Sequence, residues 1–229
     1  MSDHGPKIDP AHLVPMDSFA DDYPLRVDLV YAQADHQDNM FKSAIYRPEA
    51  RLWLHKDLAE IVKRASKLVY EQHGYKMILF DGLRTTEAQG LMLETDIVKA
   101  NPHWIEGETR LLSPPGRGGH PRGMAIDLTL ETQDWAEIDM GTRFDELSTE
   151  SAGPQVNKAH RDSPHISAEA GHNRDILTGF MMLAAKELSL PLLPIAQEWW
   201  DFRFPAEYYS DYAPLSDADL PSEMRMVSA

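Results

Sequence analysis

The chain has no cysteine among its 229 residues. Disulfide bonds and thiolate ligands are therefore excluded, and any zinc ion must be held by histidine, aspartate or glutamate. Basic residues are also scarce, because 22 lysines and arginines stand against 37 aspartates and glutamates, for a formal net charge of -15. Such a charge repels phosphate backbones, and no basic stripe overrides it, so we expect no nucleic-acid partner.

Long hydrophobic runs are missing as well. Nowhere do about 18 apolar residues follow one another, the length at which a membrane-spanning helix is suspected. Residues 1–6 lack the basic start and the apolar stretch of a secretion signal. These absences predict a cytoplasmic protein with no membrane partner. Hydrophobic residues make up 42% and charged residues 26%, which are proportions typical of a folded globular chain.

The length of the chain fits one domain with one core. Residues 1–24 are rich in aspartate and proline and show little periodicity, so they predict an N-terminal surface segment. The folded domain is expected over 25–204. An acidic C-terminal tail, interrupted by prolines, is expected over 205–229.

Hydrophobic periodicity predicts both strands and helices in this domain. Strands are expected at 27–31 and 77–80, and helices from about 49 to 73, from Thr86 to just before Asn101, and from about 176 to 188. Thr86 and Gln89 form a capping-box pattern, Gly74 is a stop signal, and 142–172 has the composition of a long loop. We predict an α+β fold, a single domain with a small, mainly antiparallel sheet flanked by helices.

The most informative stretch is a glycine-rich loop over 116–123 that carries His120 and leads directly into a hydrophobic strand. Alternation in this strand places Asp127 on the face opposite the isoleucine and leucines. A carboxylate there is costly to desolvate without a cation or a donor, and nitrogen plus carboxylate ligation suits zinc. His120 and Asp127 are therefore candidate metal ligands. The alternative is a solvated histidine and an aspartate paired with Arg117 or Arg122.

A second unusual stretch sets two adjacent tryptophans between acids, in the order Glu198, Trp199, Trp200, Asp201. Alternation predicts a strand over 198–204, with Glu198 and Trp200 on one face and Trp199 and Asp201 on the other. A dry aromatic wall raises the proton affinity of a glutamate toward the working pH, which suits a general base. The alternative is a strand whose aromatic residues fill the core and whose acids face water.

Both stretches belong to a series of short segments that runs in order from about residue 26 to 204. The segments are Asp28-Leu29-x-Tyr31-Ala32, Leu79-x-Asp81-Gly82-x-Arg84, Gly119-His120-x-Arg122-Gly123-x-Ala125-Ile126-Asp127-Leu128-Thr129-Leu130, Met140-Gly141-Thr142-x-Phe144-Asp145, Asn173-Arg174 and Glu198-Trp199-Trp200. The series resembles the zinc D-alanyl-D-alanine dipeptidases of the vancomycin-resistance type. The resemblance also implies the α+β arrangement expected above, with 25–204 as a metallopeptidase domain.

The resemblance further implies one zinc ion per chain, with His120 and Asp127 as ligands. It implies that Glu198 is the base that activates the metal-bound water, and that Asp145 and Tyr31 lie around the substrate, where a carboxylate could meet the ammonium end of a dipeptide.

Arg84 would steady the developing oxyanion, as the resemblance implies. The residues themselves offer two roles for this side chain. It could form a salt bridge to Asp81, or it could bind an anion, because it lies just ahead of the N-terminus of a predicted helix.

One position departs from the family pattern. The family has Glu-Trp-Trp-His, with the histidine as third zinc ligand, whereas this chain has Asp201 after its tryptophans. Asp201 could ligate the metal itself, another histidine such as His160, His165 or His172 could substitute, or tight metal binding could have been lost. We favour Asp201, because carboxylates are ordinary zinc ligands.

Aspartate at this position has two consequences. Counted alone, it lowers the charge of the site by one unit relative to imidazole, which makes a bound metal a weaker Lewis acid. A straight strand would also send Glu198 and Asp201 to opposite faces, so the chain must bend near Trp199 and Trp200 for both to reach one ion.

The sequence thus predicts a zinc-dependent dipeptidase that hydrolyses D-alanyl-D-alanine. Two alternatives remain: a related metallopeptidase with another dipeptide or a cell-wall peptide terminus as substrate, and a catalytically weakened binding protein of the same fold.

Overall fold

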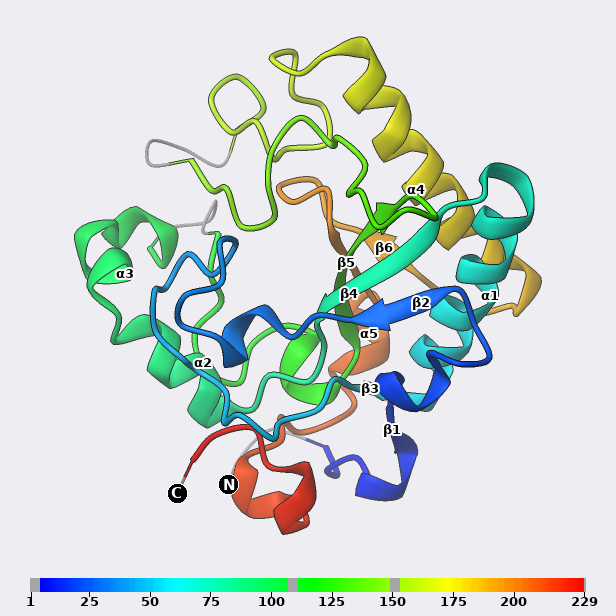
Figure 1. Ribbon diagram of the computed structural model, residues 1–229. Coiled ribbons are helices and arrows are strands. Elements are labelled where there is room, and N and C mark those ends of the chain that lie inside the picture. Colours follow the sequence, from blue (N-terminus) through cyan, green and yellow to red (C-terminus); the bar gives the residue numbers. More distant parts are fainter. Residues whose placement is uncertain (1–4, 107–110, 149–152, 229) are drawn as a thin grey trace.

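A five-stranded sheet lies at the centre of the protein (Figure 1). The computed structural model describes residues 5–106, 111–148 and 153–228. The strand order is β2 (Leu25–Val27), β4 (Lys76–Asp81), β5 (Ala125–Glu131), β7 (Asp201–Arg203) and β6 (Leu193–Pro194). The β2–β4 pair is parallel and the other three pairs are antiparallel. The predicted α+β fold with a small, mainly antiparallel sheet is confirmed.

Two long helices, α1 (Lys56–His73) and α4 (Ala168–Glu187), pack side by side along one side of the sheet (Figure 1). The buried residues of α1 recur at helical spacing and form its inner face, namely Leu58, Ala59, Ile61, Val62, Ala65, Ser66, Leu68 and Val69. The helix ends at Gly74 as predicted, because the left-handed φ of 71° is open to glycine without a steric penalty. It begins at Lys56, later than predicted.

The later start has a structural reason. Trp53–His55 forms strand β3, which pairs antiparallel with β1 (Leu13–Pro15) in a separate two-stranded sheet. The N-terminal segment predicted to lie on the surface therefore contributes a strand, and Leu13 and Met16 within it are buried. The C-terminal tail likewise places apolar side chains in the core, namely Leu215, Leu220, Met224 and Met226. Residues 1–4 and 229 of these two segments lie outside the described residues.

The remaining helical elements are short. They are α2 (Thr86–Leu93), α3 (Asp96–Ala100) and α5 (Ala206–Tyr209), with 3-10 turns at Pro10–His12, Met16–Phe19, Val30–Ala32, Pro102–Trp104, His120–Arg122, Asp217–Asp219 and Ser222–Met224. The helix predicted to end before Asn101 does so, although it is divided into α2 and α3. Among the helices of the described ranges, none has the length and apolar character needed to cross a bilayer.

Three local predictions were wrong. The strand expected at 27–31 ends at Val27, and Tyr31 lies in a 3-10 turn whose apolar residues are buried without being extended. The cap of α2 is Thr85, whose hydroxyl accepts from the amide of Ala88, and Gln89 does not close a capping box with Thr86. Gln89 instead binds the glycine-rich loop, since its side chain accepts from the amide of Gly116 at 2.7 Å and donates to the carbonyl of Arg117 at 3.1 Å.

The third concerns the stretch expected as a strand over 198–204. Only Asp201–Arg203 forms a strand, and Trp199 and Trp200 occupy a turn. The stretch over 142–172 is irregular, as predicted, in its described part up to α4, which begins at Ala168; residues 149–152 lie outside the described ranges.

Gly123 allows a stability prediction. Its φ is 62°, and a Cβ there would lie 2.8 Å from Leu13 Cδ2 and 3.1 Å from the amide nitrogen of His55. We expect Gly123→Ala to lower the free energy of unfolding by about 1–3 kcal/mol, since both the backbone and the neighbours oppose a side chain.

Gly90→Ala is the matched control, because a Cβ at Gly90 in α2 meets nothing within 4 Å. This variant should gain about 0.5–1 kcal/mol from the better helix propensity of alanine. Urea unfolding measures both changes, and equal effects of the two substitutions would contradict the argument.

Candidate active site

Three aspartates lie opposite one another on adjacent strands of the sheet. Asp81 of β4 pairs in register with Asp127 of β5, and Asp127 pairs with Asp201 of β7. All three are buried, with at most 2% of each residue exposed. Like charges directly opposed across a sheet destabilise it, so cations must compensate this row.

A register shift in β4 creates the row. Leu79 pairs with Leu128, so a regular ladder would set Phe80 against Asp127, but an irregularity between Leu79 and Asp81 sets Asp81 there instead. Such a bulge redirects a side chain to the other face of the sheet. Asp81 is thereby brought into the site, where the hydroxyl of Tyr46 donates to it at 2.5 Å.

Two arginines neutralise much of this charge. Arg84 donates to Asp81 through Nε at 2.8 Å and Nη2 at 2.6 Å, and its Nη2 lies 3.4 Å from Asp127. Arg203 donates to Asp201 Oδ1 through Nε at 2.8 Å and to Oδ2 through Nη2. The salt bridge between Arg84 and Asp81 that the sequence offered is therefore present, and Arg84 also lines the pocket.

His120 faces the same row from its loop. Nδ1 donates to the carbonyl of Gly82 at 2.8 Å, which directs Nε2 toward Asp127 Oδ1 at 3.6 Å and Asp201 Oδ2 at 3.4 Å. Burial and Arg84 lower the pKa of His120, but Asp127 and Asp201 outweigh them and raise it to about 10. A proton on Nε2 thus faces two carboxylates, and metal binding exchanges such a proton for the ion.

The glycine-rich loop is held by the backbone and by Arg122. The amide of Arg84 donates to the carbonyl of His120 at 3.1 Å. Arg122 donates to the carbonyls of Gly116, Gly118 and Tyr212, and it is not the partner of Asp127. The alternative in which Asp127 pairs with a loop arginine is therefore not what the fold shows.

The donor set fits a divalent cation. Two groups of side chains bring potential ligand atoms within 4.8 Å of one another: Asp81 with His120 and Asp127, and Asp127 with Glu198 and Asp201. Asp127 Oδ1 is buried and accepts no hydrogen bond from the described part of the chain. A buried carboxylate oxygen without a hydrogen-bond donor is stabilised by a bound cation. Imidazole and carboxylate groups together are common zinc ligands.

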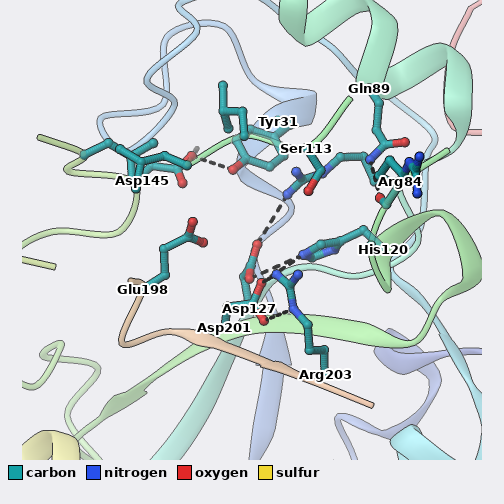
Figure 2. A pocket seen from close by; sticks show the side chains of 15 residues that line it. Tyr31, Arg84, Gln89, Ser113, His120, Asp127, Asp145, Glu198, Asp201 and Arg203 are labelled. Carbon is teal, nitrogen blue, oxygen red and sulfur yellow. Dashed lines mark hydrogen bonds and ion pairs between the residues drawn. The ribbon is translucent and has the colours of Figure 1, made fainter. Parts of the chain in front are cut away.

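Glu198 reaches this site because the chain bends as required. The amide of Asp201 donates to the carbonyl of Glu198 at 3.3 Å, which closes the turn through the two tryptophans. Figure 2 shows the Glu198 side chain pointing into the space beside Asp127 and Asp145. Burial, then Asp201 and Asp127, raise the pKa of Glu198 well above its usual value.

Two residues complete the far wall of the pocket. The hydroxyl of Tyr31 donates to Asp145, and the guanidinium of Arg84 lies 5.4 Å from the centre of the Tyr31 ring (Figure 2). Burial is the main cause that raises the pKa of Asp145 to about 8. The predicted site residues Tyr31, Arg84, His120, Asp127, Asp145, Glu198 and Asp201 all line one pocket.

The other candidate histidines lie elsewhere. His160 Nδ1 accepts from the amide of Asp162, His165 Nε2 lies 2.9 Å from the carbonyl of Gln155, and His172 is in α4. None of the three belongs to a group of potential metal ligands in the ranges the structure describes.

Two features of the site were not predicted from the sequence, namely Arg203 as the partner of Asp201 and the place of Asp81 opposite Asp127. Arg203 shares a strand face with Asp201 in the expected alternation, which is the signal that could have identified it. Asp81 depends on the bulge in β4, for which the sequence carries no comparable signal.

Comparisons with known proteins identify the family of this chain. Residues 9–217 match the model of the peptidase M15 family described as D-Ala-D-Ala dipeptidase. The D-alanyl-D-alanine dipeptidase of Escherichia coli (strain K12) is 28% identical over 181 residues, which cover 79% of each chain. The enzyme of the same name from Enterococcus faecium is 29% identical over 175 residues, or 72% of this chain and 77% of the relative.

Among solved structures, the L-Ala D-Glu endopeptidase ChiX of Serratia marcescens aligns with 69% of this chain and 84% of its own, at 15% identity and a TM-score of 0.37. That likeness is too weak to bear on function. The family match spans nearly the whole described chain and includes every residue of the pocket. The chain therefore belongs to the D-Ala-D-Ala dipeptidase family of the M15 peptidases.

Proposed function

We propose that this protein is a zinc-dependent dipeptidase that hydrolyses D-alanyl-D-alanine. The observation that carries the proposal is the convergence of His120, Asp127 and Asp201 in one pocket, which the carboxyl of Glu198 also faces. The family match and the names of both relatives support the substrate.

His120 Nε2, Asp127 Oδ1 and Asp201 Oδ2 would hold the zinc ion, because these atoms face one another across the row of aspartates. Bound there, zinc supplies Lewis acidity and lowers the pKa of water. The hydrogen bond from His120 Nδ1 to Gly82 holds the imidazole in the orientation that ligation requires.

Glu198 acts as the general base. Its raised pKa makes the ionised carboxylate a stronger proton acceptor than an exposed glutamate. The carboxylate takes a proton from the attacking water and returns it to the nitrogen of the leaving amino acid. One water is consumed, the peptide bond breaks, and Glu198 ends in its starting state.

Arg84 stabilises the negative charge that develops on the carbonyl oxygen of the substrate. Its guanidinium is permanently charged and is held in place by Asp81 and the ring of Tyr31, so it needs little reorganisation during the reaction. The charge on Asp81 therefore serves mainly to position Arg84.

Asp145 binds the ammonium group of the dipeptide. Burial gives Asp145 a pKa of about 8, so its carboxyl is mostly protonated at neutral pH in the absence of substrate, with Tyr31 as hydrogen-bond donor. A neighbouring ammonium favours the charged form of this carboxyl, so substrate binding and ionisation of Asp145 reinforce each other. This pairing selects substrates with a free amino terminus.

The assignment of Asp201 as the third zinc ligand can be tested by measuring zinc affinity. We expect Asp201→Ala to lower zinc affinity by more than about 100-fold, because a direct ligand is lost and even the outer-shell partners of ligands are worth about 10- to 100-fold. His165→Ala, which alters an alternative histidine in the loop, should keep the affinity of the unmodified protein. Chelator competition measures the zinc affinity of both variants. If only the His165 variant loses zinc affinity, His165 and not Asp201 is the third ligand.

The role of Glu198 as general base can be tested by measuring zinc binding and dipeptide turnover separately. Glu198→Gln should retain zinc but lose about 10²- to 10⁴-fold in kcat on D-alanyl-D-alanine, since the amide accepts no proton. Glu207→Gln, at an exposed position in α5, is the control and should be fully active. Full turnover by the Glu198 variant would refute the assigned role, and a panel of other dipeptides checks the substrate.

The ammonium anchor can be tested with a blocked substrate. Asp145→Asn should lower kcat/KM for D-alanyl-D-alanine by about 10- to 100-fold, the factor expected for about 1.5–3 kcal/mol from a hydrogen bond to a charged group. The N-acetylated dipeptide should be a poor substrate for both proteins. Asp145 has no such role if the variant still prefers the free dipeptide as strongly as the unmodified protein does.

A further inference from the structure

Asp201 and Arg203 form an ion pair at the edge of the metal-binding group. They lie two residues apart on the same face of β7. Nε and Nη2 of the guanidinium donate to the two different oxygens of the carboxylate, which is the forked arrangement that arginine and carboxylate prefer. Asp201 is 1% exposed, so this contact lies out of bulk water.

The two hydrogen bonds from Arg203 leave the carboxylate of Asp201 able to bind a metal ion. A carboxylate has about four acceptor positions, and Arg203 uses one on each oxygen. Oδ2 also lies 3.4 Å from His120 Nε2, on the side where Asp127 converges. The same oxygen can therefore receive a proton or a cation while the fork stays in place.

The pairing differs from that of the other two aspartates in the row. His120 lies within 3.6 Å of all three carboxylates. Asp81 and Asp127 share one arginine, Arg84, whereas Asp201 is paired with Arg203. The charge of Asp201 is thereby balanced within its own strand. An aspartate and an arginine together carry no net charge, and neither does a neutral imidazole.

We propose that Asp201 and Arg203 act together as one electrically neutral metal ligand, in which Asp201 supplies the oxygen and Arg203 cancels its charge. The inference rests on the proposed function, because it concerns the zinc site of that dipeptidase. Asp201 alone would add one negative charge to the metal ligand set relative to histidine, and Arg203 cancels that charge. Together, Asp201 and Arg203 give the ligand set the same charge as a single neutral histidine would give without Arg203.

Arg203 is thus a positioning residue that acts through Asp201. Removing its charge leaves an uncompensated carboxylate, which attracts a divalent cation more strongly. Replacing Asp201 by histidine has the opposite effect, because Arg203 is then an unpaired cation beside the ion. The two substitutions made together restore neutrality.

The experiment measures the zinc dissociation constant of five proteins by chelator competition, without substrate. Relative to the unmodified chain, Arg203→Gln should bind zinc about tenfold more tightly, because the charge of Asp201 is no longer cancelled. Asp201→His should bind zinc about tenfold more weakly, because Arg203 is then an unpaired cation beside the ion. Arg203→Lys keeps the charge and should stay near the unmodified value. The double variant Asp201→His with Arg203→Gln should also return to it.

Thermal unfolding identifies any variant that does not fold, and Arg203→Met replaces Arg203→Gln in that case. The proposal is overturned if Arg203→Gln binds zinc no more tightly, if Arg203→Lys behaves like Arg203→Gln, or if the double variant binds as weakly as Asp201→His. A chain that binds no zinc also overturns it. Hydrolysis of D-alanyl-D-alanine is assayed separately, so the failure of the proposed function is recognised independently.

Discussion

The row of three aspartates across the sheet is the constraint on which the site depends. Asp81, Asp127 and Asp201 are buried and face one another on adjacent strands, an arrangement that repels itself unless cations lie within contact distance. Arg84 and Arg203 meet that requirement from the two ends of the row. The negative potential left near Asp127, where one oxygen accepts no hydrogen bond from described residues, is what makes this place suitable for a divalent ion.

The rest of the fold holds this charged row in place. The long helices α1 and α4 support the sheet on one side, and the loop that carries His120 is tied down by Gln89 and Arg122. The turn through Trp199 places Glu198 over the row, and the indole donates to the hydroxyl of Thr142 at 2.7 Å. Glu198 and the proposed metal ligands are thus held in one place by segments far apart in the chain.

Much of the site could be predicted because its residues stand out locally. Asp127 interrupts a hydrophobic strand, His120 lies in a loop rich in glycine, and Glu198 adjoins two tryptophans. The order of these segments also identified the family. Tyr31 was expected in a strand but lies in a turn, because a short run of alternating apolar residues fits buried positions on either structure.

The sequence by itself determined the donor chemistry, the alternation of Asp201 and Arg203 on one strand face, and the need for a bend before them. The tertiary structure alone decided that Asp81 joins the row and that both oxygens of Asp201 accept from Arg203. The reason is physical: side-chain alternation is a local property of each strand, whereas register and bulges are set by the pairing of strands distant in sequence.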